Sequence, residues 1–240
     1  MTNQKLLSRK QISLFHHSFF VETQIRHFEI ISASSHHPQK VLFDIGGGCG
    51  YFATAVRRDF DIQVRVMDQD EDSIKIAQKA GVEAFVGDLF TFTSKGDEGT
   101  VCFNLILHHL VSSSEKETRS MQIRALSRWS ESNVQIFVNE YIYESYLLDL
   151  TGWLIYAITS NKMLSLLLSI ISKVVPSLRA NTFGTGVRFR SNSGWRAIFE
   201  EAGFSIQGEI RGMPEKVSLA RRLLLISQIR LDSFLLTPCK

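Results

Sequence analysis

The sequence predicts an α/β protein built on a doubly wound, largely parallel β-sheet. Five apolar segments of strand length alternate with segments of helical periodicity between residues 41 and 139. A glycine-rich loop joins the first of these strands to the helix that follows it. The chain has 240 residues, of which 44% are hydrophobic and 21% charged, so we expect 1–240 to form a single domain with a sizeable core.

The first half of the chain begins with a predicted amphipathic helix over about 11–32, in which apolar residues recur at helical spacing. Short apolar runs then predict three strands, and the segments between them have helical periodicity. Gly81 follows the second of these helices at the C′ position, where glycine is favoured. The predicted strands are 41–45, 64–68 and 84–86, and the predicted helices are 51–58 and 71–79.

The next two strands are predicted over 100–107 and 134–139. The first is apolar apart from Asn104, as expected for a central parallel strand that is buried on both faces. Between the two strands, Ser114 and Glu117 have the S-x-x-E spacing of a capping box, which predicts that a helix begins there and runs to about residue 129.

Beyond the fifth predicted strand the alternation of strand and helix patterns stops, and it resumes only near the C-terminus. We interpret residues 141–192 as a helical lid insertion that covers the carboxyl ends of the strands, where ligands bind in such sheets. A helix over 193–202 follows, and then two extended segments, 204–210 and 223–229. We expect these two segments to form an antiparallel closing pair, because no strongly periodic helix lies between them.

The most apolar part of the insertion is 147–178, in which polar residues recur at helical spacing from Lys162 to Lys173 and leave a wide apolar face. We expect core packing against the sheet to cover that face. A pocket for an apolar substrate, a homodimer interface and contact with a membrane surface are the alternatives. The longest uncharged run, 150–161, is too short to span a bilayer.

The composition indicates which classes of partner, and which cellular compartment, are to be expected. The net charge of +3 is too small to favour a nucleic acid, which we therefore regard as an unlikely partner. Three widely spaced cysteines show no disulfide or zinc-ligand pattern, so we expect no metal site and a reducing compartment. Residues 1–10 lack the apolar core of a signal peptide, and we expect a cytoplasmic protein.

The glycine-rich loop carries the main functional signal, Asp44-Ile45-Gly46-Gly47-Gly48-Cys49-Gly50. Glycines at a first strand-to-helix turn let the backbone approach a ligand. Residues 48–53 also satisfy G-x-G-x-x-A, with Asp68 twenty residues beyond Gly48, so a dinucleotide site is an alternative. However, Asp44 would repel a pyrophosphate and suits a ligand with an ammonium and a sulfonium group, which favours S-adenosylmethionine.

The sequence resembles the class I S-adenosylmethionine-dependent methyltransferase family, small-molecule type. Several motifs of that family occur in this chain in the expected order. Residues 41–50 resemble its first motif, and Asp68 stands where that family has an acid at the end of the second strand. Further matches are Gly87-Asp88-Leu89, the segment 103–110 that ends in L-H-H-L, and the W-x-x-x-x-x-x-A-G-F pattern of 195–204. The resemblance implies a Rossmann-like sheet of seven strands whose last strand is antiparallel. It does not extend over about 147–190.

The resemblance also implies roles for individual residues in binding S-adenosylmethionine, which leaves as S-adenosylhomocysteine. The loop glycines would approach the amino acid part of the cofactor, and Asp68 would accept both ribose hydroxyls. Gln69 and Leu89 would flank the adenine, whose amino group would donate to Asp88. The full cofactor set is Asp44, Gly46, Gly47, Gly48, Gly50, Asp68, Gln69, Asp88, Leu89 and Asn104.

Two histidines and three residues after the predicted fifth strand are candidates for catalysis and substrate contact. His108 or His109 could be a general base, or could simply be hydrogen-bonded in place. Glu140, Tyr141 and Tyr143 could line the substrate or pack under the insertion. We expect transfer of a methyl group to an oxygen or nitrogen of a hydrophobic small molecule, as in natural product biosynthesis. A methyltransferase acting on protein or RNA and a non-catalytic binding module are the alternatives.

Overall fold

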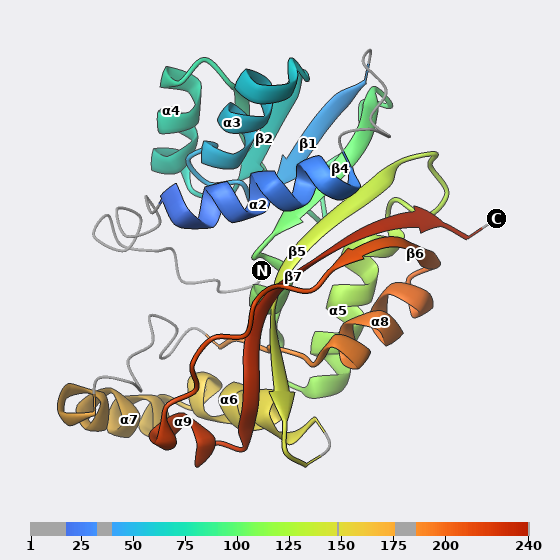
Figure 1. Ribbon diagram of the computed structural model, residues 1–240. Helices are drawn as coiled ribbons and strands as arrows, with labels where there is room; N and C mark the ends of the chain where they lie inside the picture. The colour runs from blue at the N-terminus through green and yellow to red at the C-terminus, as the bar shows by residue number, and fades with distance from the viewer. Residues whose placement is uncertain (1–17, 33–39, 148, 176–185, 240) are drawn as a thin grey trace.

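The computed structural model describes residues 18–32, 40–147, 149–175 and 186–239 (Figure 1). Residues 11–17 of the predicted N-terminal helix and parts of the predicted insertion lie outside these ranges. In chain order the helices are α2 (Ser18–Ile31), α3 (Tyr51–Phe60), α4 (Glu71–Lys79), the 3-10 turn η2 (Leu107–His109), α5 (Glu115–Ser127), α6 (Leu150–Ser160), α7 (Lys162–Val174), α8 (Asn192–Glu201) and α9 (Leu219–Arg222). The strands are β1 (Val41–Ile45), β2 (Val64–Asp68), β3 (Glu83–Val86), β4 (Glu98–Asn104), β5 (Gln135–Ser145), β6 (Phe204–Ile210) and β7 (Ile226–Pro238).

The strands form one seven-stranded sheet in the order β3-β2-β1-β4-β5-β7-β6. The pairs from β3 to β5 are parallel, whereas β7 is antiparallel to both of its neighbours. The predicted fold class, including the antiparallel last strand, is therefore confirmed. Because β1 to β4 are parallel and adjacent, the residues at their carboxyl ends lie along one edge of the sheet.

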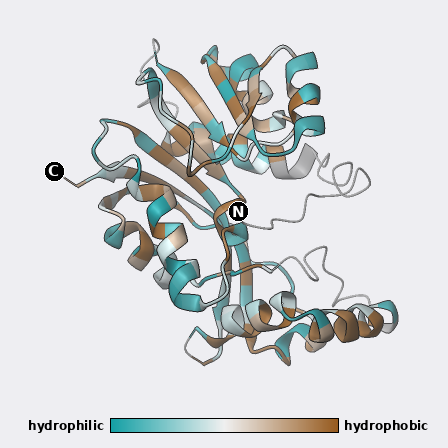
Figure 2. Ribbon diagram, turned by 180° about the vertical axis from the view of Figure 1, so that it is seen from behind, coloured by the Kyte–Doolittle hydropathy of each residue, from teal (hydrophilic) through white to brown (hydrophobic). Residues whose placement is uncertain are grey.

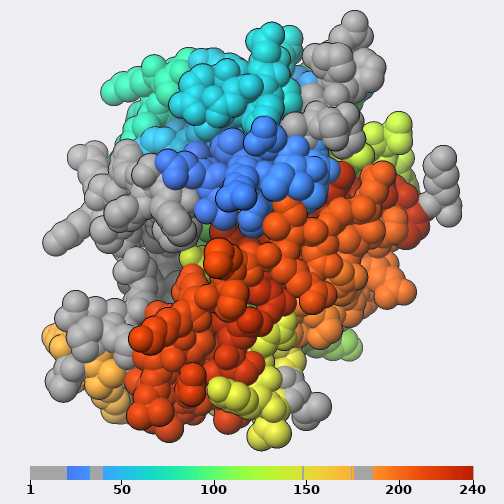
Figure 3. Space-filling view, in the orientation of Figure 1, coloured from blue at the N-terminus to red at the C-terminus, as the bar shows by residue number. Residues whose placement is uncertain are grey.

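Successive residues of the central strands pack on opposite faces and so produce a three-layer structure. Leu42 belongs to a core cluster with residues of α2, α3 and α4, whereas its neighbour Phe43 belongs to a cluster with residues of α5 and α8. The ring of Phe28 on α2 is completely buried and lies edge-on to Phe52 and Phe137. Helix α2 contacts β6 and β7 as well as α3, and Figure 1 shows it in front of the sheet on the same side as α3 and α4. The space-filling view of Figure 3 shows α2 at the surface of this face.

Strands β5 and β7 are much longer than their sequence patterns predict. They pair in antiparallel register from Ile136 opposite Leu236 to Ser145 opposite Ile226, and Figure 1 shows both strands continuing beyond the sheet towards α6. Tyr141 and Tyr143 therefore lie within β5. The predicted strand over 223–229 is wrong at its start, because α9 occupies the preceding residues and the chain turns at Leu225, whose φ is 61°, before β7 begins.

Strand β4 is shorter than predicted and ends at Asn104. Leu105 adopts a positive φ of 55°, a conformation that a branched side chain rarely takes, and its N–H donates to the carbonyl of Asn139. The chain then forms η2, so the L-H-H sequence lies on a helical turn at the sheet edge and not on a strand.

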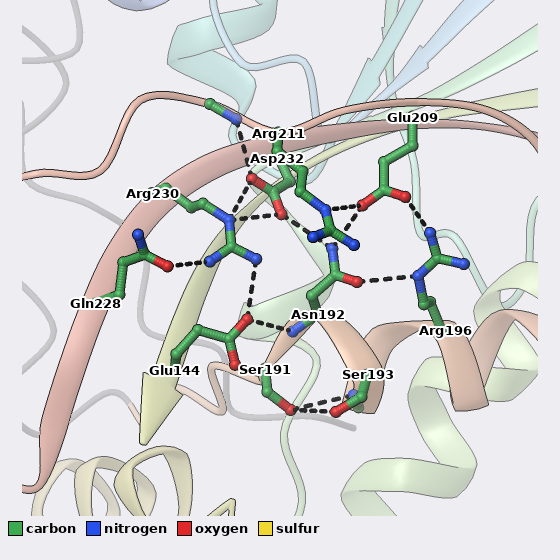
Figure 4. Close-up of polar contacts among 12 residues, drawn as sticks. Glu144, Ser191, Asn192, Ser193, Arg196, Glu209, Arg211, Gln228, Arg230 and Asp232 are labelled. Carbon is green, nitrogen blue, oxygen red and sulfur yellow. Dashed lines mark hydrogen bonds and ion pairs between the residues drawn. The ribbon is translucent and has the colours of Figure 1, made fainter. Parts of the chain in front are cut away.

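A polar network connects β5, β7, β6 and the start of α8 (Figure 4). The buried carboxylate of Asp232 accepts from Arg230 Nε (2.9 Å), Asn192 Nδ2 (3.0 Å) and the Gly212 N–H (3.0 Å). Arg230 also donates to Glu144 at 2.9 Å. Since the buried charges are paired and hydrogen-bonded to one another, we assign this network a structural role at the antiparallel edge.

Helix α7 contradicts the expectation of core packing. Among the side chains of α7 that the structure describes, those of Ser165 and Ser172 are buried, whereas those of Met163, Leu164, Leu166, Leu167, Ile170 and Ile171 are exposed. In the described ranges no single helix is both long enough and apolar enough to cross a bilayer. Helices α6 and α7 reach that length and hydropathy only when taken together, and they meet at a bend of 99°.

Candidate cofactor and catalytic site

The glycine-rich loop between β1 and α3 has a backbone that L-residues with side chains rarely adopt. Gly46, Gly48 and Gly50 have φ values of 69°, 52° and 71°. Gly47 is constrained differently, because a Cβ added there would lie 2.4 Å from Asp44 Oδ2. The loop backbone therefore passes directly over the Asp44 carboxylate, which requires glycine at that point.

Asp44 is buried at the end of β1 and lies beside Asn104 at the end of β4. Asn104 Nδ2 donates to Asp44 Oδ1 at 3.0 Å. Among the described residues, Asp44 Oδ2 and Asn104 Oδ1 have no hydrogen-bond partner. Burial raises the pKa of Asp44 to about 7, although the bond from Asn104 acts in the opposite direction. Buried acceptors of this kind on two hydrogen-bonded residues suit a ligand that donates hydrogen bonds and carries a positive charge.

The acids at the ends of β2 and β3 are held by backbone and side-chain donors. The Gly48 N–H donates to Asp68 Oδ2 and the Asp70 N–H to Asp68 Oδ1, each at 2.9 Å. Gln69 Nε2 donates to Asp88 Oδ2 at 3.0 Å. The structure thus brings the predicted cofactor residues together along the edge formed by β1 to β4. Leu89 differs from the others, because its side chain is buried in the core cluster on the α5 side.

His108 and Glu140 form a buried pair between η2 and β5. His108 Nδ1 lies 2.7 Å from Glu140 Oε2, and the Leu107 N–H donates to Glu140 Oε1 at 2.7 Å. Glu140 has no exposed surface and His108 is 5% exposed. Glu140, which was predicted to line the substrate, therefore binds the His108 ring and the backbone of η2 instead.

An aromatic stack covers the other side of His108. The ring of Phe189 lies between His108 (4.6 Å between centroids) and Tyr143 (4.3 Å). The His109 ring lies 4.2 Å from that of His108, and burial together with this neighbour places the pKa of His109 well below its usual value. Phe189 also belongs to an apolar cluster that contains Ile155 of α6, and Tyr141 packs against the same cluster.

The segment Val187–Arg190 lies over this pair, and its arginines are buried, although the sequence favours a solvated basic edge here. The Arg188 N–H donates to the His108 carbonyl at 2.9 Å, and the Tyr143 N–H donates to the Arg190 carbonyl at 3.1 Å. Both guanidinium groups bind Glu115 at the start of α5, each at 2.8 Å. The available signal was the alternation of apolar and basic residues over these four positions, Val187-Arg188-Phe189-Arg190, which is too short to predict a strand by itself.

No family model and no curated protein matches the sequence. Among solved structures, the MccD protein superposes with a TM-score of 0.60 at 11% identity, over 92% of this chain and 96% of that one. Geranyl diphosphate C-methyltransferase from Streptomyces coelicolor A3(2) superposes with a TM-score of 0.58 at 10% identity, over 99% and 86%. The mitomycin 7-O-methyltransferase MmcR gives 0.56 at 15% identity over 96% of this chain, which spans 58% of MmcR.

The chain has the class I methyltransferase fold. Its last strand, β7, lies between β5 and β6 and is antiparallel to β5. A dinucleotide-binding sheet of order 3-2-1-4-5-6 has no such strand. The topology therefore differs from that of the dinucleotide-binding sheet that the glycine spacing left as an alternative.

The residues present fit S-adenosylmethionine as judged from their own geometry. The unpartnered oxygens of Asp44 and Asn104 can accept from an ammonium group beside the glycine loop. Each oxygen of Asp68 accepts one backbone N–H and keeps a lone pair for a hydroxyl. A Cβ built on Gly48 would meet no atom closer than Asp68 Oδ2 at 4.0 Å, so the loop leaves space on that side.

Proposed function

We propose that this protein is an S-adenosylmethionine-dependent methyltransferase whose acceptor is an oxygen or nitrogen of a hydrophobic small molecule. The observation that carries the proposal is that two buried oxygens, Asp44 Oδ2 and Asn104 Oδ1, have no partner among the described residues, and that Asp44 Oδ2 lies directly against Gly47 of the glycine loop. A buried carboxylate without a partner is costly, and a cationic amino acid group would compensate for it.

The cofactor would be held along the sheet edge. Asp44 and Asn104 would accept from its ammonium group, Asp68 from its ribose hydroxyls, and Asp88 from its adenine amino group. When bound, the cofactor supplies an electrophilic methyl group on a sulfonium. The chief tasks of the protein are then to orient the acceptor in line with that methyl group and to exclude water.

His108 is our candidate for the general base. Glu140 holds Nδ1 of the ring, which leaves Nε2 as the nitrogen that can take the proton of a hydroxyl or ammonium acceptor. The lone pair of the acceptor would take the methyl group from the bound cofactor, whose sulfur would keep the electrons of the carbon–sulfur bond, while His108 would take the proton of the acceptor on Nε2. The neighbouring carboxylate then compensates the charge.

The surroundings of His108 support an apolar acceptor. Phe189 and Tyr143 stack beside the imidazole, and Ile155 on α6 and Val187 belong to the apolar cluster against which Tyr143 packs. Two solved structures with this fold are named for small molecules, mitomycin and geranyl diphosphate. We extend only the acceptor class, a hydrophobic small molecule, to this chain.

Isothermal titration tests the cofactor without requiring the acceptor. We expect the purified protein to bind S-adenosylmethionine and not NADH. Asp68→Ala should weaken that binding by about tenfold to a hundredfold, because hydrogen bonds to a charged acceptor contribute roughly 1.5–3 kcal/mol. Asp72→Ala removes an exposed carboxylate near the start of α4 and should leave binding unchanged. Binding of NADH alone would overturn the proposal.

A transfer assay tests the acceptor class. Protein incubated with methyl-labelled S-adenosylmethionine and a cell extract should label the fraction that partitions into organic solvent. Label that appears only in precipitated protein or RNA would contradict a small-molecule acceptor. His108→Gln should abolish most of the transfer while the variant retains cofactor binding, since a positioned base typically contributes about 10²–10⁴-fold.

A further inference from the structure

Helix α7 turns a polar face towards the protein and an apolar face towards the solvent, whereas a helix that packs on a globular core does the reverse. The buried side chains of α7 that the structure describes are serines, with Ser165 4% and Ser172 6% exposed, whereas Met163 is 77% and Leu166 64% exposed. Ser165 Oγ donates to the Ile158 carbonyl at 2.7 Å, which ties α7 to the end of α6. Figure 2 shows α7 as a strongly hydrophobic helix at the end of the molecule farthest from α3 and α4.

Further apolar side chains are exposed on the elements that neighbour α7. On and before α6 the exposed side chains include Trp153, Leu147 and Tyr146, and at α9 they include Leu219 and Leu223. The α9 region contacts α6, because Thr151 Oγ1 donates to the Leu224 carbonyl at 3.2 Å. Figure 1 shows the three helices together at one end of the fold. We call these exposed side chains, with those of α7, the α7 surface.

Basic residues accompany the α7 surface. Residues 150–175 contain Lys162 and Lys173, both exposed, and no acid. Residues 213–223 contain Lys216, Arg221 and Arg222 against a single acid, Glu215. An apolar helical face flanked by cations, with an exposed Trp and Tyr nearby, matches the chemistry of the boundary between the headgroups and acyl chains of an anionic membrane.

The same charges disfavour a second copy of the chain as the occupant. A two-fold axis through the α7 surface would bring the same basic residues of both copies together, with Glu215 as the one acid in these two ranges to balance them. The 99° bend between α6 and α7 also suits helices that lie in the membrane surface and do not cross it.

We propose that the α7 surface docks this protein on an anionic lipid bilayer, with α7 lying in the plane of the interface. The apolar side chains of α7 would enter the acyl boundary while Lys162 and Lys173 remain at the level of the phosphates. This inference goes beyond the proposed methyl transfer and does not depend on it, because docking requires neither cofactor nor acceptor.

Vesicle flotation of the whole protein tests the proposal. We expect the protein to float with vesicles of phosphatidylcholine mixed with phosphatidylglycerol and to bind vesicles of phosphatidylcholine alone much more weakly. Leu166→Gln/Leu167→Gln/Ile170→Gln should reduce binding to the mixed vesicles by about a hundredfold or more, because it removes three apolar side chains from the interface. Lys162→Gln/Lys173→Gln should reduce it by about fivefold per lysine.

The control is Ile30→Gln/Ile76→Gln, which makes the same chemical change at exposed positions of α2 and α4 and should leave flotation unchanged. Since the substituted α7 side chains are exposed, the triple variant should retain the circular dichroism spectrum of the wild type. Failure to float, or flotation that does not depend on phosphatidylglycerol, would overturn the proposal. So would sedimentation showing a dimer that the triple variant dissociates, because a second copy would then cover the α7 surface.

Discussion

The Glu140 carboxylate binds His108 through one oxygen and the backbone of η2 through the other. Its Oε2 lies 2.7 Å from His108 Nδ1, and its Oε1 accepts from the Leu107 N–H at 2.7 Å. Because Glu140 is on β5 and His108 is on η2 after β4, this one buried carboxylate links η2 to β5 and holds the imidazole ring through Nδ1. Removing this carboxylate should therefore lower the stability of the protein, whether or not it also affects catalysis.

We expect Glu140→Ala to lower the free energy of unfolding by about 3 kcal/mol or more, because it leaves a buried N–H and a buried imidazole without their acceptor. Glu140→Gln should cost less than half as much, since its amide oxygen can still accept from Leu107. Urea denaturation measures both values. Glu131→Ala, at an exposed position, is the matched control, and equal losses for Glu140→Ala and Glu140→Gln would contradict this account.

Asp44 should make the cofactor-free protein less stable as the pH rises. Burial raises its pKa from 3.8 to about 7, so between these values the folded protein holds one more proton than the unfolded chain. Stability then falls as the pH increases through that window, by roughly 4 kcal/mol in total. Asp44→Asn should lack this contribution. Thermal unfolding of both proteins from acid to neutral pH measures the difference, and parallel curves would show that Asp44 does not titrate in this range.

The same carboxyl should make cofactor binding pH-dependent in the opposite direction. A cationic ligand binds the ionised form of Asp44, so affinity should increase as the pH rises to about 7 and then become constant. Titration calorimetry at several pH values checks this, provided that ionisation of the cofactor itself is measured separately. Asp44→Asn should bind weakly and without the rise below neutral pH. An unchanged pH profile in that variant would assign the dependence to another group.

Gly47→Ala should weaken cofactor binding by about tenfold or more. Its Cβ would lie 2.4 Å from Asp44 Oδ2, so either the loop or the carboxylate must move away from the position that the ligand requires. Gly96→Ala is a useful comparison, because Gly96 has a φ of 78° but open surroundings far along the chain from the loop. That variant should be slightly less stable and bind the cofactor normally. Normal binding by both variants would mean that the loop tolerates displacement.

The two faces of the α6–α7 pair should respond differently to the same substitution. Ile155→Ala removes a buried side chain of α6 from an apolar cluster and should destabilise the protein by about 2–5 kcal/mol. Leu167→Ala, on the exposed face of α7, should change stability by no more than about 0.5 kcal/mol. Chemical denaturation in the absence of lipid distinguishes them. A large effect at Leu167 would show that this face is covered within the protein itself.

Local sequence patterns predicted most of the parallel half of the fold. The bounds of β1, β2 and α4 agree with the predicted ranges, and Ser114 caps α5 by accepting the Glu117 N–H as its spacing indicates. These features depend on residues that are near one another in the chain, such as alternating buried positions, caps and turn glycines. The glycine loop and the acids at the strand ends could be found for the same reason, since parallel topology places them along one edge.

What depends on distant pairing was decided only by the tertiary structure. The length of β5 is set by its register with β7, far along the chain, so no local pattern could show that Tyr143 lies in a strand beside Phe189. The link from Glu140 to His108 likewise requires two strands to be neighbours. The sequence by itself determined that α7 would have a wide apolar face, but which side faces the protein depended on the serine contact with α6, because periodicity specifies a stripe and not its partner.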